Sequence, residues 1–200
     1  MYNCYFKNSR IPKRYEDEIQ LVPIKDDFDS FKRLQYIKEH IVDFVKRGDN
    51  LFLYSHNCGN GKTTWATKIM KEYINQVQNY AFSNNTPALF INTNNFLNKV
   101  KLSISDPSLK EEVNEIKKLI TESNLVIFDD FGDKTLSEFE LCLLYDWIDT
   151  RISNLKSCIY TSNQSPDELK RVLDGKLYSR VIKATEKNQI KFYSGDRRGL

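Results

Sequence analysis

The chain has 200 residues, of which 30 are Lys or Arg and 27 are Asp or Glu, so its formal net charge is +3. A chain of this length forms one compact domain with a buried core and leaves little room for a second full domain. The mildly basic charge permits a nucleic-acid partner but does not by itself indicate one.

The four cysteines are scattered and form no C-x-x-C pair, which argues against a zinc knuckle and against a disulfide framework. No apolar run approaches the roughly 20 residues of a membrane span. The first ten residues are polar and lack the apolar core of a signal peptide. We therefore expect a cytoplasmic protein that has no membrane partner.

Residues 1–27 mix aromatic and charged side chains without a sustained period, as a linker or arm does. Apolar residues at helical spacing predict helices over residues 30–48, 62–80, 93–100, 107–120, 137–154, 166–173 and 176–184. Short apolar runs predict strands over residues 51–54, 88–91, 125–128 and 157–160, and the segment 189–193 is expected to add a further strand. The expected N-caps are Asp29 or Ser30, Thr93 or Asn94, and Asp106. Strands that alternate with helices predict an α/β fold with a parallel sheet.

The strand at 51–54 leads into S-H-N-C-G-N-G-K-T-T, which fits G-x-x-x-x-G-K-[ST] except that His56 replaces the first glycine. Glycines let backbone amides turn inward around phosphates, a lysine reaches the outer phosphates, and a neighbouring hydroxyl can ligate magnesium. Because histidine tolerates positive φ, we expect the loop to close, with its tightest bends at Gly59 and Gly61. The alternative is a hairpin turn, which does not need Gly-Lys-Thr-Thr before an amphipathic helix.

This loop predicts a site for the phosphates of ATP or ADP. The candidate binding residues are Asn57, Cys58, Gly59, Asn60, Gly61, Lys62, Thr63 and Thr64.

Polar residues end the two strands that follow in the second half of the chain. Asp129 comes directly after four apolar residues, so it can emerge beside the loop and hold magnesium together with Thr63, while Asp130 can orient or deprotonate water. Asn163 can hydrogen-bond both water and a phosphate oxygen. The alternative interpretation is that the two acids end a strand and that Asn163 is a turn residue before a proline.

Several segments together resemble a known family, the bacterial and phage helicase loaders of the DnaC/DnaI type, which are AAA+ ATPases. The similarity extends over residues 11–198. The segments that carry it, in order, are IPKRY at 11–15, LVIFDDFG at 125–132, Asp149-Thr150-Arg151, IYTSN at 159–163, Leu169 and LYSRV at 177–181.

The resemblance implies the AAA+ core of a P-loop NTPase, a parallel sheet flanked by helices without a helical lid, in residues 28–200 behind an N-terminal arm, 1–27. Lys62 and Thr63 would be the Walker A pair, and Asp129 and Asp130 the Walker B pair. Asn163 would be sensor 1. Arg180, otherwise one basic residue among 30, would be an arginine finger that reaches a neighbouring subunit's nucleotide, which implies a homo-oligomer with ATP bound.

The same resemblance implies a function in DNA replication: slow ATP hydrolysis stimulated by assembly, with Mg²⁺, single-stranded DNA and a replicative hexameric helicase of the DnaB type as partners. The compact form suits a phage origin. A related alternative is an IstB-like transposition-helper ATPase that acts on duplex DNA. Another is a non-hydrolysing interaction protein, because Asp130 stands where many AAA+ proteins have Glu. A small-molecule kinase ranks lowest. The basic candidates for DNA contact are Lys99, Lys101, Lys117 and Lys118, although such lysines more often form a solvated helix face.

Overall fold

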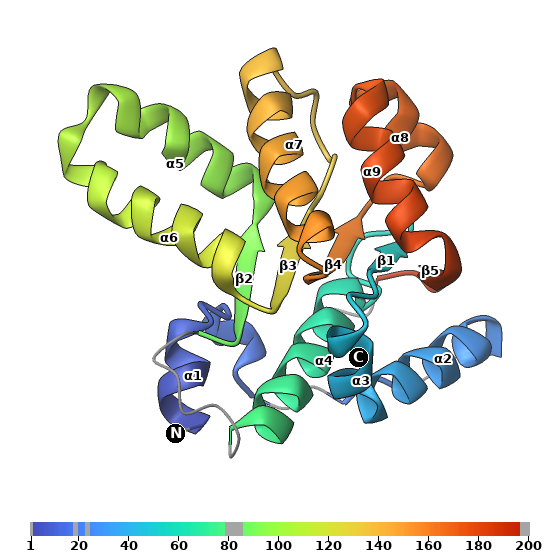
Figure 1. The fold of residues 1–200 in the computed structure, drawn as a ribbon. Coiled ribbons are helices and arrows are strands. Elements are labelled where there is room, and N and C mark those ends of the chain that lie inside the picture. Colours follow the sequence, from blue (N-terminus) through green and yellow to red (C-terminus); the bar gives the residue numbers. More distant parts are fainter. Residues whose placement is uncertain (1, 18–19, 23–24, 79–85, 197–200) are drawn as a thin grey trace.

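A five-stranded sheet forms the centre of the computed structural model, which describes residues 2–17, 20–22, 25–78 and 86–196 (Figure 1). Its strands are β1 (Leu51–Tyr54), β2 (Ala88–Asn92), β3 (Leu125–Asp129), β4 (Ser157–Ser162) and β5 (Gln189–Lys191). The order across the sheet is β2-β3-β4-β1-β5, and every neighbouring pair is parallel. This confirms the predicted parallel α/β architecture. It also brings the carboxyl ends of β1, β3 and β4 to one edge.

Helices cover both faces of the sheet (Figure 1). One layer contains α1 (Tyr2–Asn8), α2 (Phe28–Glu39), α3 (Ile41–Lys46) and α4 (Lys62–Val77). The other layer contains α5 (Thr93–Ser105), α6 (Lys110–Glu122), α7 (Glu138–Ser153), α8 (Pro166–Val172) and α9 (Gly175–Thr185). Within the described residues no helix combines the length and the apolarity that crossing a bilayer would require.

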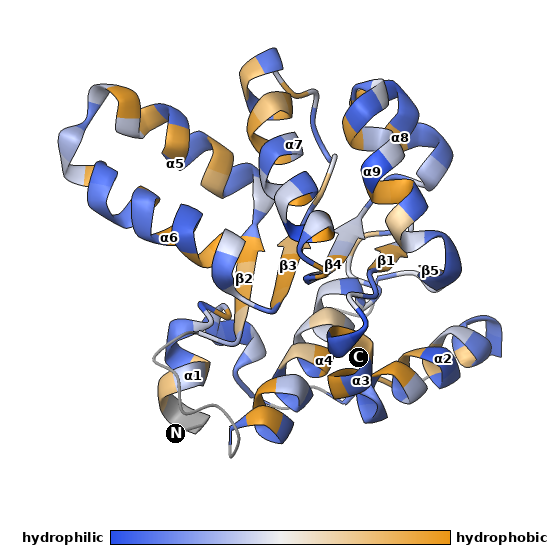
Figure 2. Ribbon diagram, viewed as in Figure 1, coloured by the Kyte–Doolittle hydropathy of each residue, from blue (hydrophilic) through white to orange (hydrophobic). Residues whose placement is uncertain are grey.

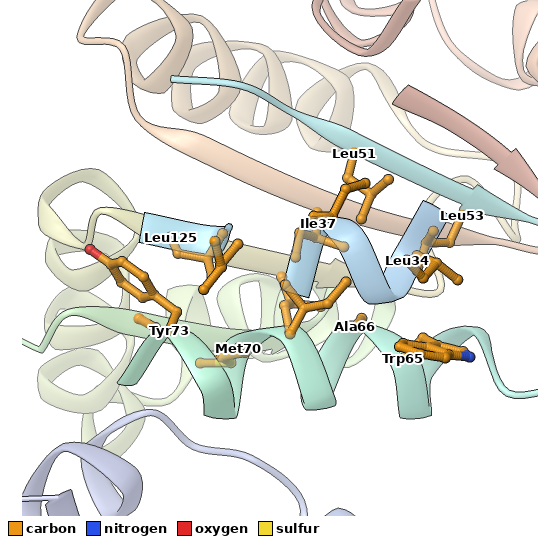
Figure 3. Packing of buried hydrophobic residues seen from close by; sticks show 14 of the residues in the cluster. Leu34, Ile37, Leu51, Leu53, Trp65, Ala66, Met70, Tyr73 and Leu125 are labelled. Atoms are coloured by element: carbon orange, nitrogen blue, oxygen red, sulfur yellow. The ribbon is translucent and has the colours of Figure 1, made fainter. Parts of the chain in front are cut away.

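The strands have two buried faces because their side chains alternate between the two helical layers. In β1, Leu51 and Leu53 pack with α4 and α2, whereas Phe52 packs with the opposite layer. Figure 3 shows Leu34 and Ile37 of α2 close to Leu51 and Leu53 of β1, with Trp65 and Met70 of α4 in the same core. Strands β2 and β3 are strongly hydrophobic, and much of the helix surface is hydrophilic (Figure 2).

The helix predicted over residues 30–48 is two helices in the structure, because α2 ends and α3 begins at His40. The amide of His40 donates to the Tyr36 carbonyl, and its ring Nδ1 lies 2.9 Å from the same oxygen. The ring does not displace the amide, and the backbone leaves the helical conformation at His40 itself, with φ −108° and ψ 27°, which local periodicity does not reveal. The N-cap of α2 is Asp27, not Asp29 or Ser30.

Other predicted boundaries shift by a few residues. Asn92 caps α5, instead of Thr93 or Asn94, by accepting a hydrogen bond from the Asn95 amide. The 3-10 turn Pro107–Leu109, with Asp106 as its predicted N-cap, precedes α6. The last strand ends at Lys191. The predicted helix end near residue 80 and the loop residues 83–85 lie outside the described residues.

The N-terminal segment contains α1, which the sequence pattern did not indicate. After α1, the Ser9 carbonyl accepts a hydrogen bond from the Phe90 amide of β2 at 2.8 Å. Arg10 then forms ion pairs with Glu112 and Glu115 of α6 at 3.2 and 3.0 Å. These contacts attach the segment to the outer edge of the sheet.

Arg151 of α7 is fully buried and donates hydrogen bonds to four backbone carbonyls, at Ile120, Ser123, Asn124 and Ser157. These carbonyls lie at the end of α6 and around the starts of β3 and β4. One guanidinium therefore joins three elements at the edge of the sheet opposite the ends of β3 and β4.

Candidate nucleotide-binding site

The loop between β1 and α4 adopts the bends that the sequence predicts. Gly59 has φ 71° and Gly61, the N-cap of α4, has φ 100°. His56 does not adopt a positive φ, so its position needs no glycine. Its ring Nδ1 lies 3.5 Å from the Glu168 carboxylate of α8. The departure from the strict motif therefore leaves the loop closed.

Lys62 lies in the first turn of α4 with only 7% of its surface exposed. Its ammonium donates to the carbonyls of Ser55 and Asn57 at 3.3 and 3.0 Å and to Asn60 Oδ1 at 3.3 Å. Burial lowers the pKa of Lys62, although nearby acidic groups oppose the shift. The buried Nδ2 of Asn60 has no hydrogen-bond partner. The loop thus offers a cation and an unused donor, which suit a polyphosphate.

Asp129, at the end of β3, lies directly beside Thr63. The Thr63 hydroxyl donates to Asp129 Oδ1 at 2.7 Å, and the Thr161 hydroxyl from the end of β4 donates to the same oxygen at 2.6 Å. Burial raises the pKa of Asp129 to about 6, with the charge of Asp130 adding to the effect and the two hydroxyls opposing it. The sequence reasoning did not select Thr161; its position at the end of a neighbouring strand was the available signal.

The pair of Thr63 and Asp129 offers a hydroxyl and a carboxylate oxygen, which are the hard ligands that magnesium takes. Among the described residues no group of three or more His, Cys, Asp or Glu side chains could hold a metal. Magnesium usually keeps several waters and binds through one or two protein oxygens and substrate phosphates. The residues present therefore fit an ion that binds together with a nucleotide.

Asp130 adopts a left-handed backbone conformation, with φ 55°. Its amide donates to the Thr161 hydroxyl at 3.1 Å, and its carboxylate accepts from Asn92 Nδ2 at 2.8 Å. The Asn94 side chain also donates to the Asp130 carbonyl. Asp130 is thus tied to the end of β2, and Asn92 is a site residue that the sequence reasoning missed.

Asn163 follows β4 and is bound to Asp133, a residue that the sequence reasoning did not select. The Asn163 amide donates to Asp133 Oδ1 at 2.9 Å, and its side-chain Nδ2 donates to Asp133 Oδ2. The Asn163 Oδ1 lies 4.0 Å from Cys58 Sγ in the phosphate loop. Burial raises the pKa of Asp133, and the Asn163 hydrogen bonds oppose that shift. In the sequence, only its place as the third acid of D-D-F-G-D, residues 129–133, could have indicated that Asp133 belongs to the site.

Arg180 lies on α9, with 46% of its side chain exposed. Its Nε is 2.6 Å from Asp149 Oδ1 of α7, so the two side chains form an ion pair. The Asp149 Oδ1 atom accepts no hydrogen bond of good geometry. Among the described residues, no hydrogen bond or ion pair joins Arg180 to the phosphate loop. The structure therefore brings together Lys62, Thr63, Asp129 and the strand-end residues, but not Arg180.

Residues 27–190 match the family of IstB-like ATP binding proteins. The chain belongs to this family. A comparison with curated protein sequences found no match.

Solved structures show the same fold at low sequence identity. A DnaC helicase loader is 19% identical with a TM-score of 0.68, covering 91% of this chain and 100% of that one. DnaI is 16% identical with a TM-score of 0.67, covering 92% and 95%. A DNA replication initiation factor is 15% identical with a TM-score of 0.62 over 86% of this chain, which spans only 48% of that structure. The resemblance to the DnaC/DnaI type and the P-loop AAA+ fold are thereby confirmed.

In this IstB-like ATP-binding domain the N-terminal segment reaches the site. Burial raises the pKa of the Tyr15 hydroxyl, and the nearby Thr63 side chain opposes this shift. The Arg14 guanidinium lies 4.6 Å from the centre of the Tyr15 ring, and its charge lowers the pKa of Asp129. A Cβ on Gly61 would lie 2.9 Å from the Leu21 side chain. The sequence reasoning used residues 11–15 only for the resemblance and missed these contacts.

Three of the four lysines considered for DNA contact form ion pairs within the domain. Lys99 pairs with Glu112 at 2.6 Å, Lys101 with Glu140 at 3.0 Å, and Lys118 with Glu122 at 3.8 Å. These carboxylates offset much of the positive charge on that surface. We therefore assign no DNA contact to these lysines.

Proposed function

We propose that this protein is an ATPase of the helicase-loader type, which binds Mg²⁺ and ATP, forms a homo-oligomer with ATP bound, and acts with a replicative hexameric helicase and single-stranded DNA. The observation that carries the proposal is the 2.7 Å contact between Thr63 and Asp129 beside the buried Lys62. That arrangement supplies a cation and a metal-binding oxygen pair at a helix N-terminus. The shared fold of the DnaC helicase loader supports the choice of partner.

Each candidate residue has a distinct role in the proposal. Lys62 and the loop amides neutralise and position the phosphates, while Thr63 and Asp129 hold the metal ion. When bound, magnesium would neutralise charge on the phosphates. Asp130 and Asn163 orient the attacking water. Arg180 acts on the nucleotide of a neighbouring subunit.

Nucleotide binding is tested by titrating labelled ATP into the wild type and into Lys62→Ala. We expect saturable binding by the wild type and none by Lys62→Ala at the same concentrations, because the buried cation is lost. Lys46→Ala, which removes an exposed lysine at the end of α3, is the matched control and should bind normally. Absence of a saturable signal from the wild type would overturn the proposed function.

Assembly is tested by sizing the protein with ATP and single-stranded DNA, with and without a replicative helicase. We expect an oligomer with ATP and a larger complex when the helicase is added. Binding to DNA should weaken steeply with added salt, because phosphate contacts release counterions. A protein that stays monomeric with ATP, DNA and helicase together would exclude the loader assignment.

A transposition-helper ATPase is the second candidate, favoured by the family of IstB-like ATP binding proteins that the chain matches. Its partners would be duplex DNA and a transposase. Pull-downs with tagged protein and ATP, offering a helicase or a transposase, separate the two candidates. Capture of the transposase alone would favour this second function.

A non-hydrolysing interaction protein is the third candidate, because the Asp130 carboxylate is bound to Asn92 at 2.8 Å. A shorter acid held in this way could leave the attacking water without a base. Phosphate release at saturating ATP, followed for hours with DNA and helicase present, decides the point. Release that requires Lys62 supports the ATPase, whereas binding without release supports this candidate.

A further inference from the structure

Asp133 occupies a position in the site for which the functional roles above do not account. It lies three residues after Asp130, in the loop that follows β3, and it is half-buried beside the end of β4. It accepts both the backbone and the side-chain hydrogen bonds of Asn163. The Ser162 hydroxyl is also 3.4 Å from its Oδ1. Asp133 thus binds both the backbone and the side chain of Asn163.

The loop that carries Asp133 is fixed to β4 through Phe131, two residues before Asp133. The Phe131 amide donates to the Thr161 carbonyl at 2.8 Å, and the Ser162 hydroxyl donates to the Phe131 carbonyl at 2.6 Å. Gly132 has φ 73°, and a Cβ there would lie 2.3 Å from the Leu169 side chain. The carboxylate is therefore held by backbone contacts rather than by a mobile surface loop.

Chemistry determines which way the Asn163 amide faces. An ionised carboxylate accepts hydrogen bonds and cannot donate them, so only the NH₂ end of Asn163 can face Asp133. The Oδ1 end is turned to the other side, toward Cys58 in the phosphate loop at 4.0 Å. Asp133 therefore decides that Asn163 presents an acceptor, not a donor, to the phosphate site.

Asp133 is also close enough to the phosphate-binding lysine to affect the charge of that lysine. Burial lowers the pKa of Lys62, and among the carboxylates that oppose this shift Asp133 acts more strongly than Asp130 or Asp129. The pair of Asp133 and Asn163 therefore borders the place where the outer phosphate would lie. A terminal phosphate has no proton to offer an amide oxygen at neutral pH, whereas a water molecule has two.

We propose that Asp133 is a positioning residue for ATP hydrolysis, which locks Asn163 with its Oδ1 toward the attacking water. This inference rests on the proposed ATPase function. In the reaction the water oxygen bonds to the terminal phosphorus and the bond from phosphorus to the bridging oxygen of ADP breaks. The water proton passes to Asp130 and then to solvent. Asn163 accepts a hydrogen bond from the other water proton and so aligns the oxygen.

The test compares Asp133→Ala and Asp133→Asn with the wild type, measuring kcat in the assembled state and the Kd of labelled ATP separately. Asp133→Asn keeps the size of the side chain but replaces one acceptor oxygen by an NH₂ group. The backbone N–H of Asn163 cannot turn away, so we expect the side-chain amide of Asn163 to rotate and face the NH₂ group with its oxygen. We expect kcat to fall at least about tenfold in both variants, because water alignment is lost, while Kd stays near the wild-type value. Asp167→Asn, at an exposed position of α8, should leave both unchanged.

A double-mutant cycle shows whether Asp133 acts through Asn163. In the Asn163→Ala background, Asp133→Ala should lower kcat no further, because the residue it positions is gone. An equal loss in both backgrounds, a wild-type kcat in Asp133→Asn, or a weakened Kd with a lowered Tm would overturn the inference. Failure of the wild type to bind ATP would instead refute the proposed function.

Discussion

At the scale of single residues, Asp129 combines two opposed requirements. It is 2% exposed, and burial raises the pKa of its carboxyl to about 6, yet a metal ligand has to be ionised. The Thr63 and Thr161 hydroxyls stabilise the ionised form only in part. Protons and magnesium ions should therefore compete for this one side chain near neutral pH.

We predict that the magnesium dependence of ATP binding changes with pH. Above about 6, Asp129 is ionised and can ligate the ion; as the pH falls through 6, protonation removes the ligand. The magnesium-dependent part of ATP affinity should then decline by roughly tenfold per pH unit. Titrations of ATP from pH 5 to 8, with magnesium and with a chelator, measure it.

The control for this prediction is Asp129→Asn, which cannot ionise and should show weak, pH-independent magnesium dependence. Because the folded pKa exceeds the unfolded value, the metal-free wild type should lose stability as the pH rises toward and through about 6. The Asn variant should not lose it. If the magnesium-dependent ATP affinity of the wild type does not change between pH 5 and 8, the assignment of Asp129 as the ligand is contradicted.

The placement of the candidate site residues was predictable from sequence where a local pattern determines it. Lys62 and Thr63 follow a glycine loop at a helix start, so their placement needs no knowledge of the rest of the chain. Asp133, Thr161 and Asn92 gain their contacts because β2, β3 and β4 are neighbours in the sheet. A linear pattern does not state that order, and these residues were missed for that reason.

At the scale of elements, Arg151 joins α6, α7 and the starts of two strands through four carbonyl groups. We predict that Arg151→Ala destabilises the protein by at least about 3 kcal/mol, since each buried carbonyl left unpaired costs about 1–3 kcal/mol and a cavity adds to the loss. Urea unfolding at constant m-value measures it.

Arg171→Ala is the matched control for Arg151, because Arg171 is exposed on α8 and should contribute little. Arg151→Lys keeps the charge but presents fewer donors in one plane, so its stability should lie between the wild type and the alanine variant. If Arg151→Ala is as stable as Arg171→Ala, the four hydrogen bonds do not hold these elements together.

The N-terminal segment offers a second test at this scale. The Tyr15 hydroxyl lies near the Thr63 hydroxyl that the metal ion would use, because Thr63 lowers the pKa of Tyr15. We predict that Tyr15→Phe raises magnesium-dependent ATP affinity by about fivefold, corresponding to about 1 kcal/mol for one hydrogen bond. Calorimetric titration measures the change, with the exposed Tyr36→Phe as control. A loss of affinity would show that Tyr15 serves the bound nucleotide instead.

The elements show where sequence patterns suffice and where they fail. Strands β1 to β4 were predicted because each contains a short, mostly apolar run with two buried faces, whereas β5 buries only Ile190. The break between α2 and α3 was not predicted, because the apolar spacing continues across His40, where the backbone leaves the helical conformation. The helix α1 was missed because it is short and is stabilised by packing on α4.

At the scale of the whole molecule, Arg180 is held by Asp149 of its own chain. An arginine finger that acts on a neighbouring subunit has to leave this ion pair. The exposed pair is weakly stabilising, so assembly can replace it. We therefore predict that Arg180→Ala binds ATP like the wild type but has at least about tenfold lower turnover in the oligomer.

Mixing variants shows whether the finger acts between subunits. Lys62→Ala cannot bind ATP and Arg180→Ala lacks the finger, so each alone should be nearly inactive. A mixture should regain part of the activity, because a Lys62→Ala subunit still supplies Arg180 to an Arg180→Ala neighbour. Asp149→Asn should keep turnover. No recovery in mixed oligomers would place the role of Arg180 within its own chain.

The bond between the Ser9 carbonyl and the Phe90 amide has a practical consequence for truncated versions of the protein. β2 is the outermost strand on its side, so its free groups could pair with strands of other molecules. Residues 9 and 10 cover part of this strand edge, and the ion pairs of Arg10 attach them to α6. An expression variant trimmed to begin at residue 28 should therefore form insoluble aggregates, even though every residue of the five strands is retained.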